Sequence, residues 1–550
     1  MTARPRFHGW ITLALLGLTA LLAAAFGGRR EGLAVRPRPP EDGNVLRVAC
    51  TQLMAPDPHQ RHMPLAQYNQ LILGLWEPLV ECDPATGQPQ PAAARSWAWS
   101  ADRLTLTLAL RPDARWSNGE RVTAADFVRG WQRLLRQMTA EAETLFPLKN
   151  AAAYHRGQLK DAGAVGVHAL DDFTLQLELA APRPTLVMEL ADPLLSPLYR
   201  TDEKVLAGRE YFQTASALVT NGPFHLVQAS ADGYRLATSP WYHDFAAVHL
   251  AGVQFVRADN LAIAQLQLAA GVVDLLSPTP FGRSRTMPTV RPFTVETELE
   301  PMVTSLDFNV TRGPLQDVRV RQALALALDR SGPIQRYDPG HMVAAWAWVP
   351  DMPGRPSLTL LKEDAREARR LLAAAGYPGG RGFPVLAMDL PLASRGDPFP
   401  QAWTECWYRE LGIKTYIRYG TSTQQAAHLR AGDFDVLYNG LIATVPDAGD
   451  LLGAFLGPAE FNGSRWHDED VTALLTRASS RSGREHLDLL AQAERRVMAA
   501  VPSVPVMFQR RQTLRADEVQ GWYADPLARQ SLKRLQLAAG ISARPIRALE

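Results

Sequence analysis

Two stretches of the chain alternate leucine with small or polar residues at a period of two: LTLTLAL at residues 104–110 and TLQLELA at residues 174–180. Successive side chains of a β-strand point to opposite faces, so this period predicts strands that are buried on one face. We expect the leucines to cover a hydrophobic core.

A helical pattern begins at Thr123, which is a good N-cap, and Asp126 three residues later forms a weaker version of the capping box. The apolar residues that follow share one helix face: Phe127, Val128, Trp131, Leu134 and Leu135. Just before them, residues 117–119 (Ser-Asn-Gly) have the composition of a tight turn, with glycine available for a positive φ. We therefore interpret residues 115–135 as a scaffold element with Trp131 in the core.

Two more helices are predicted in the C-terminal half, at residues 317–330 and 363–380. The second ends with Gly376 in the C′ position and Pro378 beyond it, which are both helix-stop signals. The glycine-rich residues 376–382 follow a helix instead of opening one, so they favour a loop over a phosphate cradle. Strands and helices are thus mixed along the chain.

The N-terminus carries an apolar run at residues 10–28, preceded by Arg4 and Arg6, which is typical of an export signal. Its length lies between a secretory apolar region and a full membrane span. Residues 23–25 (Ala-Ala-Ala) offer a cleavage site, whereas Arg29 and Arg30 favour a retained anchor. We interpret residues 1–28 as a signal peptide or membrane anchor and the Pro/Arg-rich residues 29–43 as a tether.

At 550 residues the chain is longer than one hydrophobic core usually supports. Its 58 basic and 56 acidic residues give a net charge of +2 without a long basic block, so nucleic acid is not an expected partner. Three cysteines, Cys50, Cys82 and Cys406, are too sparse for a disulfide framework, although one disulfide stays open. Cys50 lies in a strand-like stretch and is interpreted as a small core residue.

The sequence contains no His-Glu-x-x-His, Gly-x-Ser-x-Gly, phosphate-loop or dinucleotide-binding motif. The absence of these motifs weakens the hypothesis that the protein is an enzyme. His467 is followed by three acids at residues 468–470, a pattern typical of a helix N-terminus. His59 and His62 have metal-like spacing but no further ligands, so we expect an exposed polar loop there. No metal or cofactor is expected.

The order of these segments resembles the oligopeptide- and dipeptide-binding proteins of ABC importers, the extracellular solute-binding protein family 5. The resemblance begins at PDPHQ (residues 56–60) and VTNGPFHL (219–226) is also part of it. The other segments that carry it are residues 74–135, 169–184, 306–330, 367–384, 429–440 and 501–527. Together these segments extend over nearly all of the chain that follows the predicted export signal.

This resemblance implies an α/β fold, similar to the type II periplasmic binding proteins, in which a two-lobed clamp carries an additional domain. The expected first lobe comprises residues 44–75, 196–300 and 501–550. The additional domain is expected at 76–195 and the second lobe at 301–500. Such lobes close over a ligand held between them.

The chain departs from the family where an acidic residue pairs with the α-amino group of a peptide ligand. In GLIATVPDAGD (residues 440–450), Leu441 stands where tryptophan is usual and Thr444 stands where the carboxylate is expected. A buried ammonium without a counter-charge is costly. Either Asp447 takes over the amine, or the ligand has a blocked or absent amine; alternatively, Asp447 only caps a helix. His62 and Pro64 match, by loop position, a segment that lines the family's cleft.

The implied function is that of a periplasmic or extracytoplasmic solute-binding component of an ABC importer for peptides or peptide-like solutes. We expect a monomer without catalytic role that works with permease subunits in the inner membrane and is tethered there if residues 10–28 are retained. The alternatives are a non-peptide solute, suggested by Leu441 and Thr444, and a sensory or enzymatic protein that reuses the fold.

Overall fold

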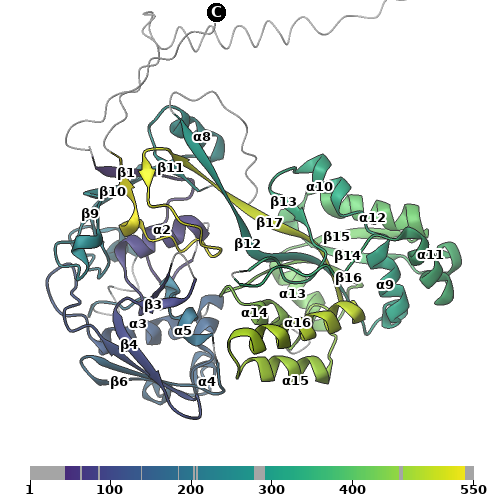
Figure 1. Cartoon of the computed structure of the whole chain (residues 1–550), viewed down its shortest axis with the longest axis horizontal. Coiled ribbons are helices and arrows are strands. Elements are labelled where there is room, and N and C mark those ends of the chain that lie inside the picture. Colours follow the sequence, from purple (N-terminus) through teal and green to yellow (C-terminus); the bar gives the residue numbers. More distant parts are fainter. Residues whose placement is uncertain are drawn as a thin grey trace, which may run out of the picture.

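The computed structural model describes residues 44–538, apart from residues 62–64, 84–86, 138, 184, 202–204, 206–208, 278–291, 353 and 457–461. The described chain forms two lobes joined by two long strands, β12 (Phe293–Phe308) and β17 (Ser503–Ala516) (Figure 1). Within this part of the chain, no helix is both long enough and apolar enough to span a membrane. The predicted export segment and tether lie outside the described residues.

One mixed sheet runs through both lobes in the order β15-β14-β16-β12-β17-β11-β1-β10-β9-β8, with β13 also paired to β17. The strands on the first-lobe side are β1 (Val45–Cys50), β8 (Phe224–Ser230), β9 (Gly233–Thr238), β10 (Gly252–Arg257) and β11 (Leu275–Leu276). Those on the second-lobe side are β13 (Met342–Ala344), β14 (Leu386–Pro391), β15 (Thr415–Gly420) and β16 (Val436–Ile442). A single hydrogen-bonded sheet therefore extends from one lobe into the other.

A separate four-stranded antiparallel sheet, in the order β4-β5-β7-β6, lies in the N-terminal half (Figure 1). Its strands are β4 (Ala94–Trp99), β5 (Thr105–Leu110), β6 (Val167–Asp171) and β7 (Thr174–Glu178). The leucines of β5 and β7 are buried, as the period of two predicted. Two short antiparallel pairs, β2 (Val80–Cys82) with β3 (Pro89–Pro91) and β18 (Val519–Gln520) with β19 (Gln536–Leu537), complete the described strands.

Helix α3 (Ala124–Arg136) confirms the predicted capped amphipathic helix, with Thr123 as its N-cap. Trp131 is fully buried, and its indole Nε1 donates a hydrogen bond to the carbonyl of Leu195 at 2.9 Å. The turn before the helix places Gly119 at φ +88°, and a Cβ there would lie 3.2 Å from the Trp241 ring. Residues 115–135 are therefore scaffold, as predicted.

The first lobe and the four-stranded sheet carry α2 (Leu65–Leu75), α4 (Ala151–His155), α5 (Leu186–Glu189), α7 (Arg209–Gln213) and α8 (Leu261–Ala269). One hydrophobic core is continuous from Leu46 on β1 through Trp76 to Leu106 on β5 and Trp131 on α3. The division of this region into a first lobe and an additional domain stays a prediction.

The second lobe carries α9 (Val318–Leu326), α10 (Ser331–Tyr337), α11 (Ala365–Ala374), α12 (Pro398–Leu411), α13 (Ser422–Ala431), α14 (Ala448–Leu452), α15 (Glu469–Ala478) and α16 (Gly483–Ala500). Helices α9 and α11 confirm two predictions, and Gly376 follows α11 at φ +99°. The second lobe has two hydrophobic cores. In the first of them, Trp403 and Trp407 on α12 are fully buried together with Phe308. The second core surrounds Leu451 of α14, and it fixes the helix that follows β16.

Candidate ligand cleft

The end of β16 sets up the candidate site. Strand β16 pairs with β12 up to Ile442, and the buried side chains of Ala443 and Val445 hold the next turn against the lobe. Thr444 between them is exposed. The Oδ2 of Asp450 accepts hydrogen bonds from the Thr444 backbone N–H at 2.5 Å and from its hydroxyl at 2.9 Å. Thr444 therefore orients a carboxylate instead of supplying one.

Asp447 has a structural role in this arrangement. It is the N-cap of α14, and its Oδ1 accepts a hydrogen bond from the Gly449 N–H at 2.7 Å. Its other oxygen lies 2.8 Å from Nε2 of His486, whose Nδ1 lies 2.9 Å from the Ala478 carbonyl. The hydrogen bond to Asp447 raises the pKa of His486 above its usual value. Asp447 therefore caps a helix, as one of the two interpretations requires, and its role at a ligand amine stays a prediction.

A cavity of about 400 Å³ lies between the two halves of the molecule. Thr444 and Asp450 line it from the second lobe. The residues that line it from the opposite side are Arg61, Glu141, Glu143, Thr144, Pro147, Arg183, Glu189, Asp192 and Leu194. The volume falls in the range of small-molecule sites, roughly 300–1,000 Å³, and the place between two lobes is where binding clefts usually occur. We take this cavity as the candidate ligand cleft.

Two ion pairs form part of the cleft wall. One Nη of Arg61 lies 2.6 and 2.8 Å from the two carboxylate oxygens of Asp192. Nε of Arg183 lies 2.7 and 2.8 Å from those of Glu189. Both acids are buried, at 8% and 5% exposure, so their charges need these partners. The pairs fix the positions of both arginines on the wall.

The segment before Arg61 is held by a buried cluster. Arg133 of α3 bridges to Asp57 at 2.6 Å and lies 3.0 Å from Nδ1 of His59. His59 is fully buried, and burial together with the nearby Arg133 lowers its pKa to about 3, so the ring is neutral. The prediction of an exposed loop is wrong for His59, because a helix distant in sequence covers it. His62 and Pro64 lie outside the described residues.

Leu441 is not among the described residues that line this cavity. It pairs with Val303 of β12 and packs against the second-lobe core. Sequence reasoning missed Asp450 and all nine residues on the opposite wall. Arg183 lies in a segment that carries the family resemblance, yet no local pattern indicates that it faces a cavity.

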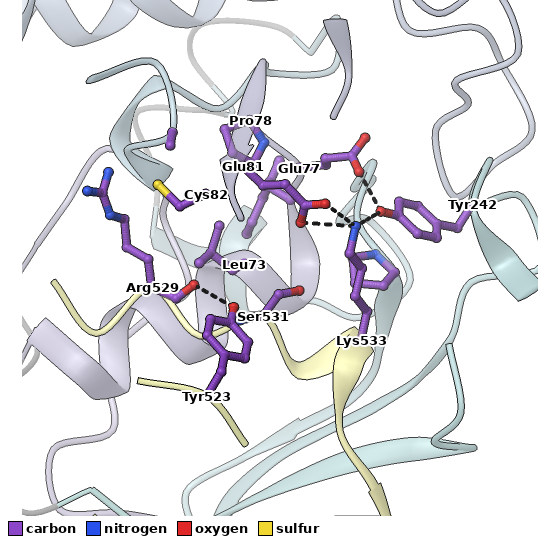
Figure 2. Close-up of a pocket in the computed structure, with 13 residues that line it drawn as sticks. Leu73, Glu77, Pro78, Glu81, Cys82, Tyr242, Tyr523, Arg529, Ser531 and Lys533 are labelled. Carbon is purple, nitrogen blue, oxygen red and sulfur yellow. Dashed lines mark hydrogen bonds and ion pairs between the residues drawn. The ribbon is translucent and has the colours of Figure 1, made fainter. Parts of the chain in front are cut away.

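A second cavity, of about 30 Å³, lies beside the C-terminal segment of the first lobe (Figure 2). Lys533 bonds there to Glu81 and to the Tyr242 hydroxyl, both at 3.1 Å, and that hydroxyl donates to Glu77. A single water needs roughly 10–15 Å³ of cavity volume, so this cavity can hold at most about two or three waters. It is a buried polar network that fastens residues 532–534 to the lobe.

The cysteines and the acidic run have structural roles. Cys50, Cys82 and Cys406 are all free thiols, and Cys50 is a fully buried core residue, as predicted. Burial raises the pKa of Cys50 to about 11. Asp468 is the N-cap of α15, which confirms the helix N-terminus interpretation. No group of three metal-ligating side chains occurs among the described residues.

These features define a two-lobed binding protein with a ligand cleft between its lobes. A family profile described as "Bacterial extracellular solute-binding proteins, family 5 Middle" matches residues 88–463. The chain belongs to this family, and its fold is that of the type II periplasmic binding proteins, as the resemblance implied.

Curated relatives cover most of the chain. It is 29% identical to the "Probable deoxycholate-binding periplasmic protein YgiS" of Escherichia coli (strain K12), over 80% of this chain and 83% of that protein. It is 26% identical to the "Periplasmic murein peptide-binding protein MppA" of the same strain, over 80% and 82%. It is 25% identical to the "Periplasmic oligopeptide-binding protein OppA" of Salmonella typhimurium (strain LT2), over 94% and 97%. These relatives are extracytoplasmic binding proteins.

Solved structures support the fold. The unliganded open form of the murein tripeptide binding protein MppA matches with a TM-score of 0.76 at 24% identity, over 90% of this chain and 97% of that one. Listeria monocytogenes OppA bound to peptide matches with a TM-score of 0.64 at 20% identity, over 90% and 99%. At these identities the likeness concerns the fold alone.

Proposed function

We propose that the protein binds a short peptide or peptide-like solute in the cleft and delivers it to an ABC importer. The observation that carries this proposal is the cavity between the lobes, which Asp450 lines from one side and the paired arginines from the other. An extended peptide offers main-chain N–H and C=O groups that such polar walls can bind without reading the sequence. Lobe closure then excludes water and favours the ligand-bound state.

Asp450 is the acid that we assign to the ligand's amino group. The family resemblance places a carboxylate at position 444, and here the Thr444 N–H and hydroxyl both bond to Oδ2 of Asp450. No described residue donates a hydrogen bond to its Oδ1, so this oxygen is available to an ammonium. Asp447 is engaged at both oxygens and is absent from the cleft lining.

The remaining parts of the proposal concern place and partners. The protein acts outside the cytoplasmic membrane, as its curated relatives do. Residues 10–28 export it and, if retained, tether it to the inner membrane near its permease subunits. It acts as a monomer, without cofactor and without a catalytic step.

A non-peptide solute is the second candidate, because one relative is named as a probable deoxycholate-binding protein. The cleft lining argues against a steroid ligand. Of the eleven described residues that line it, seven are charged, and only Pro147 and Leu194 among them are apolar. An apolar ring system would find few dispersion partners there.

The test measures binding by isothermal titration calorimetry with Ala-Ala-Ala, N-acetyl-Ala-Ala-Ala and deoxycholate. We expect Ala-Ala-Ala to bind and Asp450→Asn to weaken it by about tenfold to a hundredfold, because a charge-assisted hydrogen bond to the amine is lost. Asp447→Asn is the matched control and should leave affinity within about twofold.

Two results would contradict the proposal in different ways. Equal affinity for free and acetylated peptide, unchanged by Asp450→Asn, would remove Asp450 from the amine site. Binding of deoxycholate with no response to either peptide would replace the peptide assignment with the second candidate.

A further inference from the structure

The charge of the cleft is unbalanced. Among the eleven described residues that line it, five carry carboxylates and two carry cationic groups. The acids are Glu141, Glu143, Glu189, Asp192 and Asp450, and the cations are Arg61 and Arg183. The described part of the cleft lining therefore carries an excess of negative charge.

Both cations are already engaged. Arg61 is paired with Asp192, and Arg183 with Glu189, at the distances given above. The Thr185 hydroxyl also donates to Glu189 at 2.6 Å, which holds that acid against the wall. Neither arginine is therefore a free counter-charge for an anionic ligand.

Three carboxylates remain without a cationic partner among the described residues: Glu141, Glu143 and Asp450. Glu141 and Glu143 belong to the single short helix η2 (Ala140–Leu145), whereas Asp450 lies on α14 of the other lobe. Glu143 is exposed, and Glu141 is close enough to Arg61 to act on it electrostatically. The unpaired acids thus face the cavity from both of its sides.

We propose that the cleft selects ligands with at least two cationic groups, namely basic peptides, with Asp450 taking the amino terminus and Glu141 and Glu143 taking a cationic side chain. This inference rests on the proposed function and names the substrate class of the same site. The cavity between the lobes, and not the acids alone, defines the site. Its charge then decides which peptides enter.

The physical reason is that closure strengthens these charge interactions. While the cleft is open and filled with water, an exposed carboxylate attracts a cation only weakly. When the lobes approach, water leaves the cavity and the effective dielectric constant falls, so the attraction grows. An anionic solute would have to enter a closing cavity lined by three carboxylates that form no ion pair with a described residue, and it would find both arginines already paired.

The experiment titrates the full chain, purified in mild detergent, with Lys-Ala-Lys, Ala-Ala-Ala and Glu-Ala-Glu. We expect Lys-Ala-Lys to bind about tenfold or more tighter than Ala-Ala-Ala, and Glu-Ala-Glu to bind more weakly than both. Raising NaCl from about 20 mM to about 300 mM should reduce the difference, because salt screens the partly exposed acids.

The double variant Glu141→Gln/Glu143→Gln locates the effect. It should weaken Lys-Ala-Lys by about tenfold and leave Ala-Ala-Ala within about twofold. Neither glutamate forms an ion pair with a described residue, so folding should be unaffected, which a thermal melt checks. The matched control Glu405→Gln/Glu485→Gln removes two exposed acids outside the cleft and should change nothing.

The outcomes separate the two proposals. If Ala-Ala-Ala binds as tightly as Lys-Ala-Lys in both the parent chain and the double variant, the charge selection is overturned while peptide binding stands. If none of the three peptides binds, the proposed function fails, and the selection for basic peptides fails with it.

Discussion

At the scale of single residues, three side chains in one turn have different roles. Thr444 orients a carboxylate, Asp447 caps a helix, and Asp450 faces the cleft. Two aspartates three positions apart cannot be told apart by composition or by simple spacing. The chain direction after β16 decides which of the two lines the cleft, and the buried Ala443 and Val445 hold that part of the chain in place.

The Asp447–His486 pair predicts a pH-dependent stability. Both ring nitrogens of His486 face acceptor oxygens, so the doubly protonated ring fits best, and its pKa is raised from 6.5. The folded protein therefore holds this proton more tightly than the unfolded chain does. The stabilisation is complete below the unfolded pKa and is lost as pH rises through the raised folded pKa.

We therefore expect His486→Gln to cost about 1 kcal/mol more of unfolding free energy at about pH 5.5 than at about pH 8.5. Urea unfolding at the two pH values measures this difference. In an Asp447→Asn background the pH dependence should be much smaller, because only the Ala478 carbonyl then favours the protonated ring. A cost that grows toward alkaline pH instead would mean that the histidine is neutral in the folded state.

At the scale of elements, sequence patterns predict those helices and strands that are determined by interactions between residues close together in the chain. The leucines of β5 and the capped face of α3 follow from side-chain periodicity, and both appear as expected. The predicted exposure of His59 is wrong because Arg133, 74 residues away in sequence, packs against its ring. The cleft was missed for the same reason, since η2 and α14 are brought together only by the tertiary fold.

The N-terminus of α3 gives a prediction at this scale. The Asp126 carboxylate accepts hydrogen bonds from the Thr123 N–H at 2.8 Å and from the buried Trp116 indole at 3.2 Å. Asp126→Ala removes the capping-box carboxylate, leaves the indole N–H unsatisfied and takes away the ion-pair partner of Arg129. We expect unfolding free energy to fall by about 2–4 kcal/mol, measured by urea unfolding.

The matched control is Asp161→Ala, which removes an exposed cap that accepts only the Gly163 N–H at 2.8 Å. Its cost should be about 1 kcal/mol or less. Equal costs for the two variants would show that the indole bond adds nothing to the cap at Asp126.

At the scale of the whole molecule, β12 and β17 are the strands that both lobes share (Figure 1). Their pairing changes register between Leu299 and Val303, in the middle of the connection. Beside this irregularity, Arg511 pairs with Glu298, and its guanidinium also donates to the Asp525 carbonyl at 2.7 Å. Lobe movement is most readily absorbed where the ladder is interrupted, so we expect the hinge of the two lobes at this ion pair.

The hinge pair predicts coupled effects on stability and shape. Arg511 and Glu298 have side-chain exposures of 4% and 8%, and burial raises the pKa of Glu298 in spite of its partner. Arg511→Met leaves that acid without a counter-charge and should lower unfolding free energy by about 3–5 kcal/mol. Because Glu300 also lies 3.5 Å from Arg511 and its side chain is 9% exposed, recovery of most of this loss requires the triple variant Arg511→Met/Glu298→Leu/Glu300→Leu, in which no charge is buried alone.

The same variants test whether the pair also limits lobe movement, because a loosened ladder allows a wider range of lobe angles. Small-angle scattering of Arg511→Met should give a larger radius of gyration than the parent chain. Arg515→Met is the control: its partner Glu296 is 29% exposed, so a water-screened charge remains and both effects should be small. If Arg511→Met unfolds and scatters like the parent chain, backbone pairing alone holds the hinge strands, and the ion pair has no part in setting the lobe angle.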